Sequence, residues 1–260
     1  MSDIKKAINQ FDFSQSEYCI LSIRLKTDGF SFSIYNTITK EYYAEEIKTD
    51  PSLSLTANIK RVFKEIEFLS KPFQQKRIVF IGIRYLLLPL ELFEDEQKET
   101  LFYHSHTKKE NDIILYDIVK RNNIVVLYAI DKSAFTFLKE WDKELSIQSQ
   151  TSLLIEKLYS VNKISKKKQM FLNIQTGKID LFSFSEGELL SINTFTVQSV
   201  ADILYYSLHL WKQQGFNQQQ DEFIFLNNSK EVKSIIPELS KYIKNIQNSP
   251  FTIPIELKEE

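Results

Sequence analysis

Histidine, cysteine and carboxylate side chains carry most metal binding and nucleophilic catalysis, and this sequence offers few of them in useful patterns. His104 and His106 stand two residues apart in a polar stretch, with Asp112 as a conceivable third ligand of a metal ion. The spacing shows too little convergence for a metal site, so an exposed loop is the favoured interpretation. Cys19 is the single cysteine and has no candidate base nearby. We therefore expect neither a catalytic residue nor a metal site.

Two polar-edged hairpins, at residues 23–36 and 172–184, are the second feature of interest. Around Asp28 and Gly29, apolar and polar residues alternate with a period of two, which predicts two strands joined by a tight turn. The second stretch repeats the pattern around Gly177. Glycine is scarce, with five in 260 residues against a usual ~7%, and turns or helix caps account for four of them. Asp28 itself is interpreted as a turn residue.

The elements around each hairpin follow the same order in both halves of the chain. Each hairpin precedes a third strand, an amphipathic helix, a buried apolar strand and a further helix. In the first half these are the strand 40–48, a helix from 51 onward and the strand 77–83. In the second half they are the strand 187–195, a helix over 197–211, the strand 223–227 and a helix running through 239–243. Such spacing predicts a duplicated domain rather than a solenoid.

A segment of about residues 85–131 interrupts the first half. Its predicted elements are a helix over 89–102 and two strands at 111–119 and 123–130. A helix over 133–144, a short strand at 145–150 and a crossing helix over 151–160 then lead to the second half. The lysine run in residues 162–169 could bind phosphate, but a solvated connector is the favoured interpretation.

Composition sets limits on location and partners. The chain is 43% hydrophobic and 26% charged, with a formal net charge of −1, so no strong field attracts nucleic acid. The aromatic stretches around Phe102 and His209 are accordingly interpreted as packing rather than base-stacking surfaces. No apolar run approaches the ~20 residues of a membrane span, and no signal peptide is expected. We expect a cytoplasmic protein.

Two β-β-β-α-β-α units are the plan that the actin-like ATPase superfamily follows, and its halves resemble the ribonuclease H fold. The middle segment is similar to that of the actin-like protein of type IV pilus assembly. The stretches "LSIRLKTDGFSFSIYN", "VVLYAIDKSAFTFLKEW" and "ADILYYSLHLWKQ" resemble a bacterial family of unknown function with this fold. The resemblance implies an α/β protein with two lobes, residues 1–150 and 151–260, each built on a mixed sheet.

In that superfamily each hairpin is a phosphate clamp. An aspartate on the first strand positions magnesium, and a glycine two residues later exposes backbone N–H groups to phosphate oxygens. A Gly-Gly turn near the end of the second half lies against adenine. The matched positions and their neighbour in the second turn carry other residues here: Arg24 and Lys26 in the first hairpin, Asn173, Gln175 and Thr176 in the second, and Asn227 and Asn228 at the adenine position.

These departures imply that the nucleotide site is degenerate. Arg24 would repel a divalent cation, while Lys26 and Gln175 place long side chains where phosphate should meet bare backbone. A ribonuclease H nuclease is disfavoured for the same reason, because two-metal chemistry needs clustered carboxylates. The expected function is a non-enzymatic interaction or scaffold module with an unknown protein partner and no cofactor. An ATP-binding enzyme or kinase, with Arg24 and Lys26 holding phosphate by charge, and a ligand or peptide sensor between the lobes stay open as alternatives.

Overall fold

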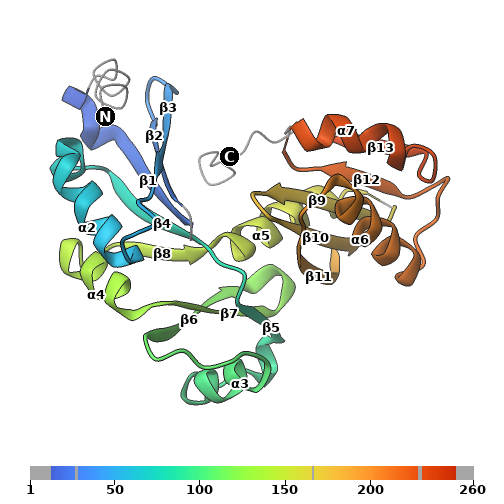
Figure 1. The fold of residues 1–260 in the computed structure, drawn as a ribbon, viewed down its shortest axis with the longest axis horizontal. Helices are drawn as coiled ribbons and strands as arrows, with labels where there is room; N and C mark the ends of the chain where they lie inside the picture. The colour runs from blue at the N-terminus through green and yellow to red at the C-terminus, as the bar shows by residue number, and fades with distance from the viewer. Residues whose placement is uncertain (1–12, 27–28, 166, 228–229, 250–260) are drawn as a thin grey trace. The chain divides into compact units, whose positions relative to one another are not determined.

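The computed structural model describes residues 13–26, 29–165, 167–227 and 230–249. They form two compact units, one of residues up to Val119 together with Asn123–Ser152, the other of Lys120–Asn122 with the residues from Leu153 onward (Figure 1). Each unit contains a five-stranded sheet, and the first also contains a three-stranded sheet. Each five-stranded sheet has its own hydrophobic core.

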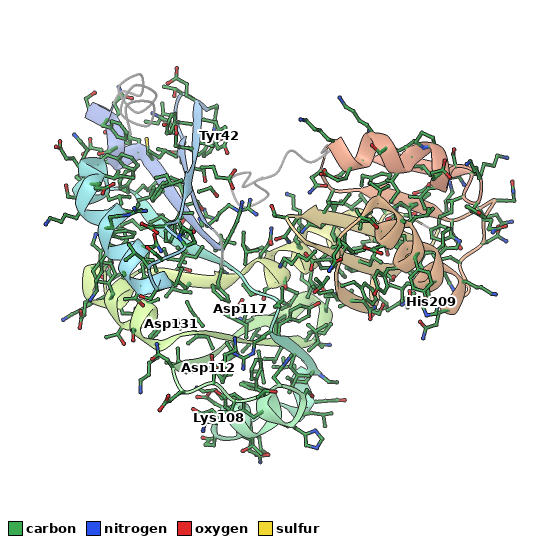
Figure 2. The ribbon with its side chains drawn as sticks, in the orientation of Figure 1. Tyr42, Lys108, Asp112, Asp117, Asp131 and His209 are labelled. Carbon is green, nitrogen blue, oxygen red and sulfur yellow. The ribbon has the colours of Figure 1, made fainter. Side chains whose placement is uncertain are left out.

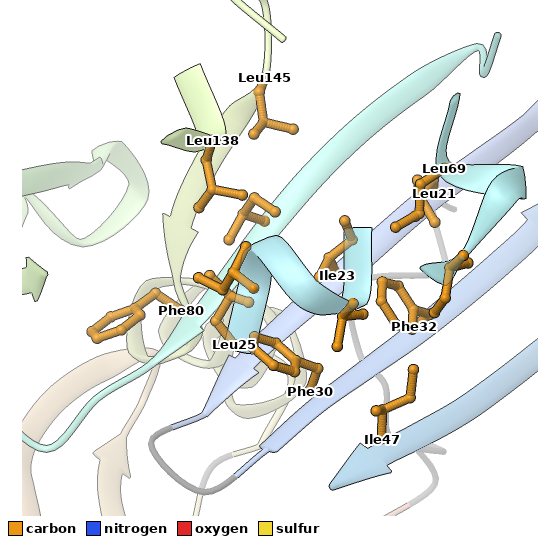
Figure 3. Packing of buried hydrophobic residues seen from close by; sticks show 14 of the residues in the cluster. Leu21, Ile23, Leu25, Phe30, Phe32, Ile47, Leu69, Phe80, Leu138 and Leu145 are labelled. Carbon is orange, nitrogen blue, oxygen red and sulfur yellow. The ribbon is translucent and has the colours of Figure 1, made fainter. Parts of the chain in front are cut away.

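The five-stranded sheet of the first unit has the order β3-β2-β1-β4-β8. Its strands are β1 (Cys19–Lys26), β2 (Gly29–Asn36), β3 (Tyr42–Lys48), β4 (Gln75–Ile81) and β8 (Ser146–Ser149). The first three form an antiparallel meander, whereas β4 pairs in parallel with β1 and β8. Ile23, Leu25 and Phe32 point into a core covered by α2 (Leu55–Glu65) and α4 (Lys132–Trp141) (Figure 3). Because side chains alternate along a strand, Arg24 and Lys26 lie on the opposite face.

The sheet of the second unit repeats this order as β11-β10-β9-β12-β13. Its strands are β9 (Gln169–Gln175), β10 (Lys178–Ser185), β11 (Glu188–Thr196), β12 (Glu222–Phe225) and β13 (Asn245–Asn248). The helices α6 (Val200–Gln213) and α7 (Lys230–Leu239) contribute Trp211 and Ile235 to the core on one face. The chain reaches this unit through α5 (Gln150–Asn162). The duplicated α/β fold with mixed sheets is thus confirmed.

The inserted segment forms the sheet β5-β7-β6, with β5 (Tyr85–Pro89), β6 (Asp112–Val119) and β7 (Ile124–Asp131). The helix α3 (Lys98–Ser105) contributes Phe102, which is fully buried against Val125 and Leu127. Asp131 ends β7 and caps α4, because its side chain accepts a hydrogen bond from the Ala134 N–H at 2.8 Å. The same carboxylate accepts from Thr56 of α2 at 3.0 Å, which fixes the insertion to the main core.

Three local expectations were wrong. The helix expected over 89–102 begins only at Lys98, as α3, and two 3-10 turns, Leu90–Leu92 and Asp95–Gln97, precede it. The apolar stretch before them is the strand β5, so the insertion has three strands rather than two. The last helix ends at Leu239, short of the expected residue 243, and the N–H groups of Tyr242 and Ile243 both bond to the Leu239 carbonyl in the turn that follows. The polar residues of β13 then pair in parallel with β12.

The N-terminus of α6 provides a test of local stability. The Ser199 hydroxyl accepts from the Asp202 N–H at 3.2 Å, and the Asp202 carboxylate accepts from the Ser199 N–H at 2.9 Å. Such a reciprocal capping box satisfies two otherwise unbonded helix donors. We expect Ser199→Ala to lower the free energy of unfolding by about 1 kcal/mol in urea titrations. Ser199→Asp keeps an acceptor and should be near neutral, so an equal loss in both variants would contradict this assignment.

Within the described ranges, no helix combines the length and the apolar character that a membrane crossing requires.

Candidate functional site

The first hairpin places Arg24 and Lys26 on the face of β1 that is turned away from the core. Arg24 is only 8% exposed, and the strand register sets it opposite Ser31 on β2. The Lys26 side chain reaches over β2, and its Nζ lies 2.6 Å from Oε1 of Glu46 on β3. The long side chain at the expected glycine position therefore lies along the hairpin in an ion pair.

The second hairpin holds a buried hydrogen-bond network around Asp180. Oδ2 of Asp180 accepts from Asn173 Nδ2 at 3.0 Å and from Gln175 Nε2 at 2.7 Å. Oδ1 accepts from the Thr194 hydroxyl at 2.7 Å. Asn173 is 1% exposed and Asp180 7% exposed, so these bonds are largely shielded from water. We call Asn173, Gln175, Asp180 and Thr194 the Asp180 network.

Asn227, at the expected adenine position, bonds to the strand that carries Asn173. Its Oδ1 accepts from the Ile174 N–H at 3.4 Å, and its Nδ2 lies 3.4 Å from Asn173 Oδ1 and also donates to the Ile174 carbonyl. Thr176 is exposed in the turn beside Gly177, whose φ of +71° suits glycine. Asn228 lies outside the described residues. The structure thus brings together Asn173, Gln175 and Asn227.

The two hairpins have equivalent registers. In the first unit a row across three strands reads Arg24, Ser31 and Glu46. In the second unit the row at the same distance from the turn reads Asn173, Asp180 and Thr194. Both rows are polar, and in each unit the long side chain two residues after the first member bonds to an acid of the row. The duplicated scaffold therefore repeats a side-chain arrangement as well as a topology.

Asp180, Thr194 and Glu46 were not among the predicted site residues. The signal that could have found them is the two-residue turn, which fixes the hairpin register. Counting back from the turn pairs Gln175 with Lys178 and therefore Asn173 with Asp180. The acid that holds the second hairpin together could thus have been identified from its distance to Gly177.

The other chemistry-bearing residues have structural surroundings. His106 caps α3, and its Nε2 lies 2.9 Å from the Tyr85 carbonyl oxygen, while Asp112 pairs with Arg84 at 2.8 Å (Figure 2). The His104 side chain lies in the last turn of α3, not on the strand that a shared metal would need. In the part of the chain that the structure describes, no three histidine, cysteine or acidic side chains converge as metal ligands would.

Two further residues are positioned for packing. Burial raises the pKa of the Cys19 thiol, and its Sγ donates to the Gln15 carbonyl at 3.4 Å, which disfavours a nucleophilic thiolate. His209 stacks on Tyr205 one turn earlier in α6, with ring centroids 5.7 Å apart (Figure 2).

Comparison with known proteins agrees with this architecture. The family model described as "Protein of unknown function (DUF3822)" matches residues 8–246. The chain belongs to the DUF3822 family. The description of the DUF3822 family assigns no activity. No protein of the curated collection matches the chain significantly.

Solved structures place this DUF3822 protein in a wider fold. A Bacteroides thetaiotaomicron VPI-5482 protein with an actin-like ATPase fold and unknown function is 41% identical, with a TM-score of 0.87, covering 96% of this chain and 99% of that one. The PilM-PilN type IV pilus biogenesis complex contains a chain with 9% identity and a TM-score of 0.60, covering 88% of each. The actin-like ATPase fold expected from the sequence is thereby confirmed.

Proposed function

We propose that this protein is a non-enzymatic member of the actin-like ATPase fold, a protein-interaction or scaffold module whose nucleotide site has been lost. The observation that carries the proposal is the Asp180 network, which fills the second hairpin with side chains bonded to one another. The proposal treats residues 1–150 and 151–260 as two lobes of one cytoplasmic scaffold. It assigns no catalytic residue, metal or nucleic-acid partner.

The physical reason is the cost of opening the network to a triphosphate. A phosphate group needs donors, but Asn173 and Gln175 already donate to a buried carboxylate at 3.0 and 2.7 Å. The carboxylate would itself repel phosphate oxygens at short range. Breaking the Asn173–Asp180 bond costs about 1–3 kcal/mol for each buried polar group that loses its partner. A ligand would have to offset this cost before gaining any affinity.

The first hairpin adds an independent reason. Lys26 occupies the position of the superfamily's clamp glycine, and its ammonium pairs with Glu46 at 2.6 Å. The ion pair is partly exposed and contributes little stability, yet it places a second carboxylate beside the turn. In each hairpin, therefore, the side chain at the expected glycine position bonds to a carboxylate.

A protein complex that contains a chain of the same fold supports the proposed protein partner. The PilM-PilN structure is a protein–protein complex built on this fold. A scaffold that keeps its architecture without a nucleotide clamp retains surfaces for such binding. We propose a protein partner of this general kind, without transferring the pilus pathway to this chain.

Nucleotide binding is tested by thermal unfolding of the full chain with ATP and magnesium. We expect no saturable change in the melting temperature. A ligand present at 100 times its Kd would stabilise the folded state by about 2.7 kcal/mol, or roughly 5–10 °C for a protein of this size. Tripolyphosphate with magnesium serves as the control for unspecific anion effects.

The alternative, an ATP-binding enzyme with a divergent site, gives the opposite result. Arg24 is the observation that favours it, because a largely buried guanidinium on β1 could hold a phosphate. In that case ATP would raise the melting temperature, and Arg24→Ala would remove the ligand-dependent part of the rise. The comparison uses each variant's own ligand-free melting temperature, so a loss of intrinsic stability does not affect the outcome.

A further inference from the structure

The outer strand β11 of the second sheet has the composition of a pairing edge. It spans nine residues, Glu188–Thr196, and no charged side chain lies between its two ends. The other outer strands differ: β8 and β13 have four residues each, β5 has five and ends in Pro89, and β3 and β6 carry acids within their length. Short length, proline and charge are the devices that prevent edge pairing.

The duplicated fold supplies an internal comparison. The registers β2·β3 and β10·β11 make Glu45 of β3 the equivalent of Asn193 of β11. Antiparallel pairing of two copies of β3 around Glu45 would place two like charges directly opposite, which is destabilising. The same operation on β11 places two neutral asparagines opposite each other. The first unit thus has a charged edge at the position where the second has an uncharged one.

The sequence of β11 is also compatible with antiparallel pairing between two copies of the strand. With a two-fold axis at Asn193, Ile192 lies opposite Thr194 of the other copy, and Ser191 lies opposite Phe195. The Ile192–Thr194 pair joins two β-branched residues, which is favourable, and neither pair contains a charge. The regular pairing with β10 extends from Ser191 to Thr196, beyond the irregularity at Ser183 and Phe184, so the axis falls within undistorted strand.

We propose that two copies of this chain associate through antiparallel pairing of β11 with β11 around Asn193. The two five-stranded sheets then form one continuous sheet of twice the width. Such an isologous contact closes on itself and leaves no further β11 edge exposed. The inference is independent of the proposed loss of the nucleotide site.

Disulfide trapping tests the register directly. Residues facing each other across an antiparallel pair have Cα atoms about 4.5–5.5 Å apart, within the range of a disulfide. Asn193→Cys is expected to form a covalent dimer under mild oxidation in the full-length protein. Glu45→Cys, at the equivalent position of the other edge, is the matched control and should remain at background. The native Cys19 thiol is buried and should not compete.

Sedimentation equilibrium gives a second readout without cysteine chemistry. We expect the wild-type chain of 30.7 kDa to sediment at about twice that mass, and Asn193→Lys to sediment as a monomer with unchanged circular dichroism. Glu45→Lys should remain dimeric. A monomeric wild type, a dimer that survives Asn193→Lys, or equal cross-linking of both cysteine variants would each overturn the proposal.

Discussion

Replacing Phe32 with alanine is expected to lower the free energy of unfolding by about 3–5 kcal/mol. The ring is 1% exposed and lies in the centre of the first core, where it meets Phe68 edge to face at a centroid distance of 6.0 Å. It faces Ile23 across the hairpin. Its removal leaves a cavity that the paired strands cannot close, because their register fixes the backbone.

Urea unfolding followed by circular dichroism measures this loss. Ser31→Ala is the matched control, because Ser31 lies one residue away on the other face of β2, opposite Arg24. Its replacement should change the free energy by less than about 1 kcal/mol. Similar small losses in both variants would show that the hairpin does not pack as the structure has it.

The alternation that identified this hairpin also shows how much of the fold the sequence determines locally. Phe30, Phe32 and Ile34 alternate with serines, and a strand with one buried face needs this pattern. By contrast, β5 is an unbroken apolar run, and β13 is polar except for Ile246. Neither has a period, because the neighbours β7 and β12 determine their pairing. These two strands could be found only from the tertiary structure.

The candidate site was predictable to a similar extent. The positions of Asn173 and Gln175 were identified from the hairpin, and their shared acceptor Asp180 was missed although the two-residue turn places it opposite Asn173. Which residue lies opposite on a neighbouring strand depends on the turn length, and Thr194 depends on a second pairing beyond it. The irregularity between Ser183 and Phe184 shifts that second register. Because no sequence pattern marks this shift, Thr194 could not be assigned to the network in advance.

The Asp180 network gives the second large effect. Asp180 accepts three side-chain hydrogen bonds at 2.7–3.0 Å while 7% exposed. Hydrogen bonds to a charged acceptor contribute about 1.5–3 kcal/mol each, and the buried Asn173 amide loses this acceptor. Since bonds in one network are not additive, we expect Asp180→Ala to lower the free energy of unfolding by about 2–4 kcal/mol.

The sign of this effect distinguishes a structural network from a ligand site. Carboxylates placed for ligand binding often reduce stability, so their removal is neutral or stabilising. A carboxylate that holds three donors is instead required by the fold. In thermal and urea unfolding, Thr194→Val should remove one bond and cost about 1 kcal/mol, and Asp180→Asn should fall between Thr194→Val and Asp180→Ala. A gain in stability with Asp180→Asn would identify Asp180 as a ligand-binding group and overturn its assignment as the residue that closes the second hairpin.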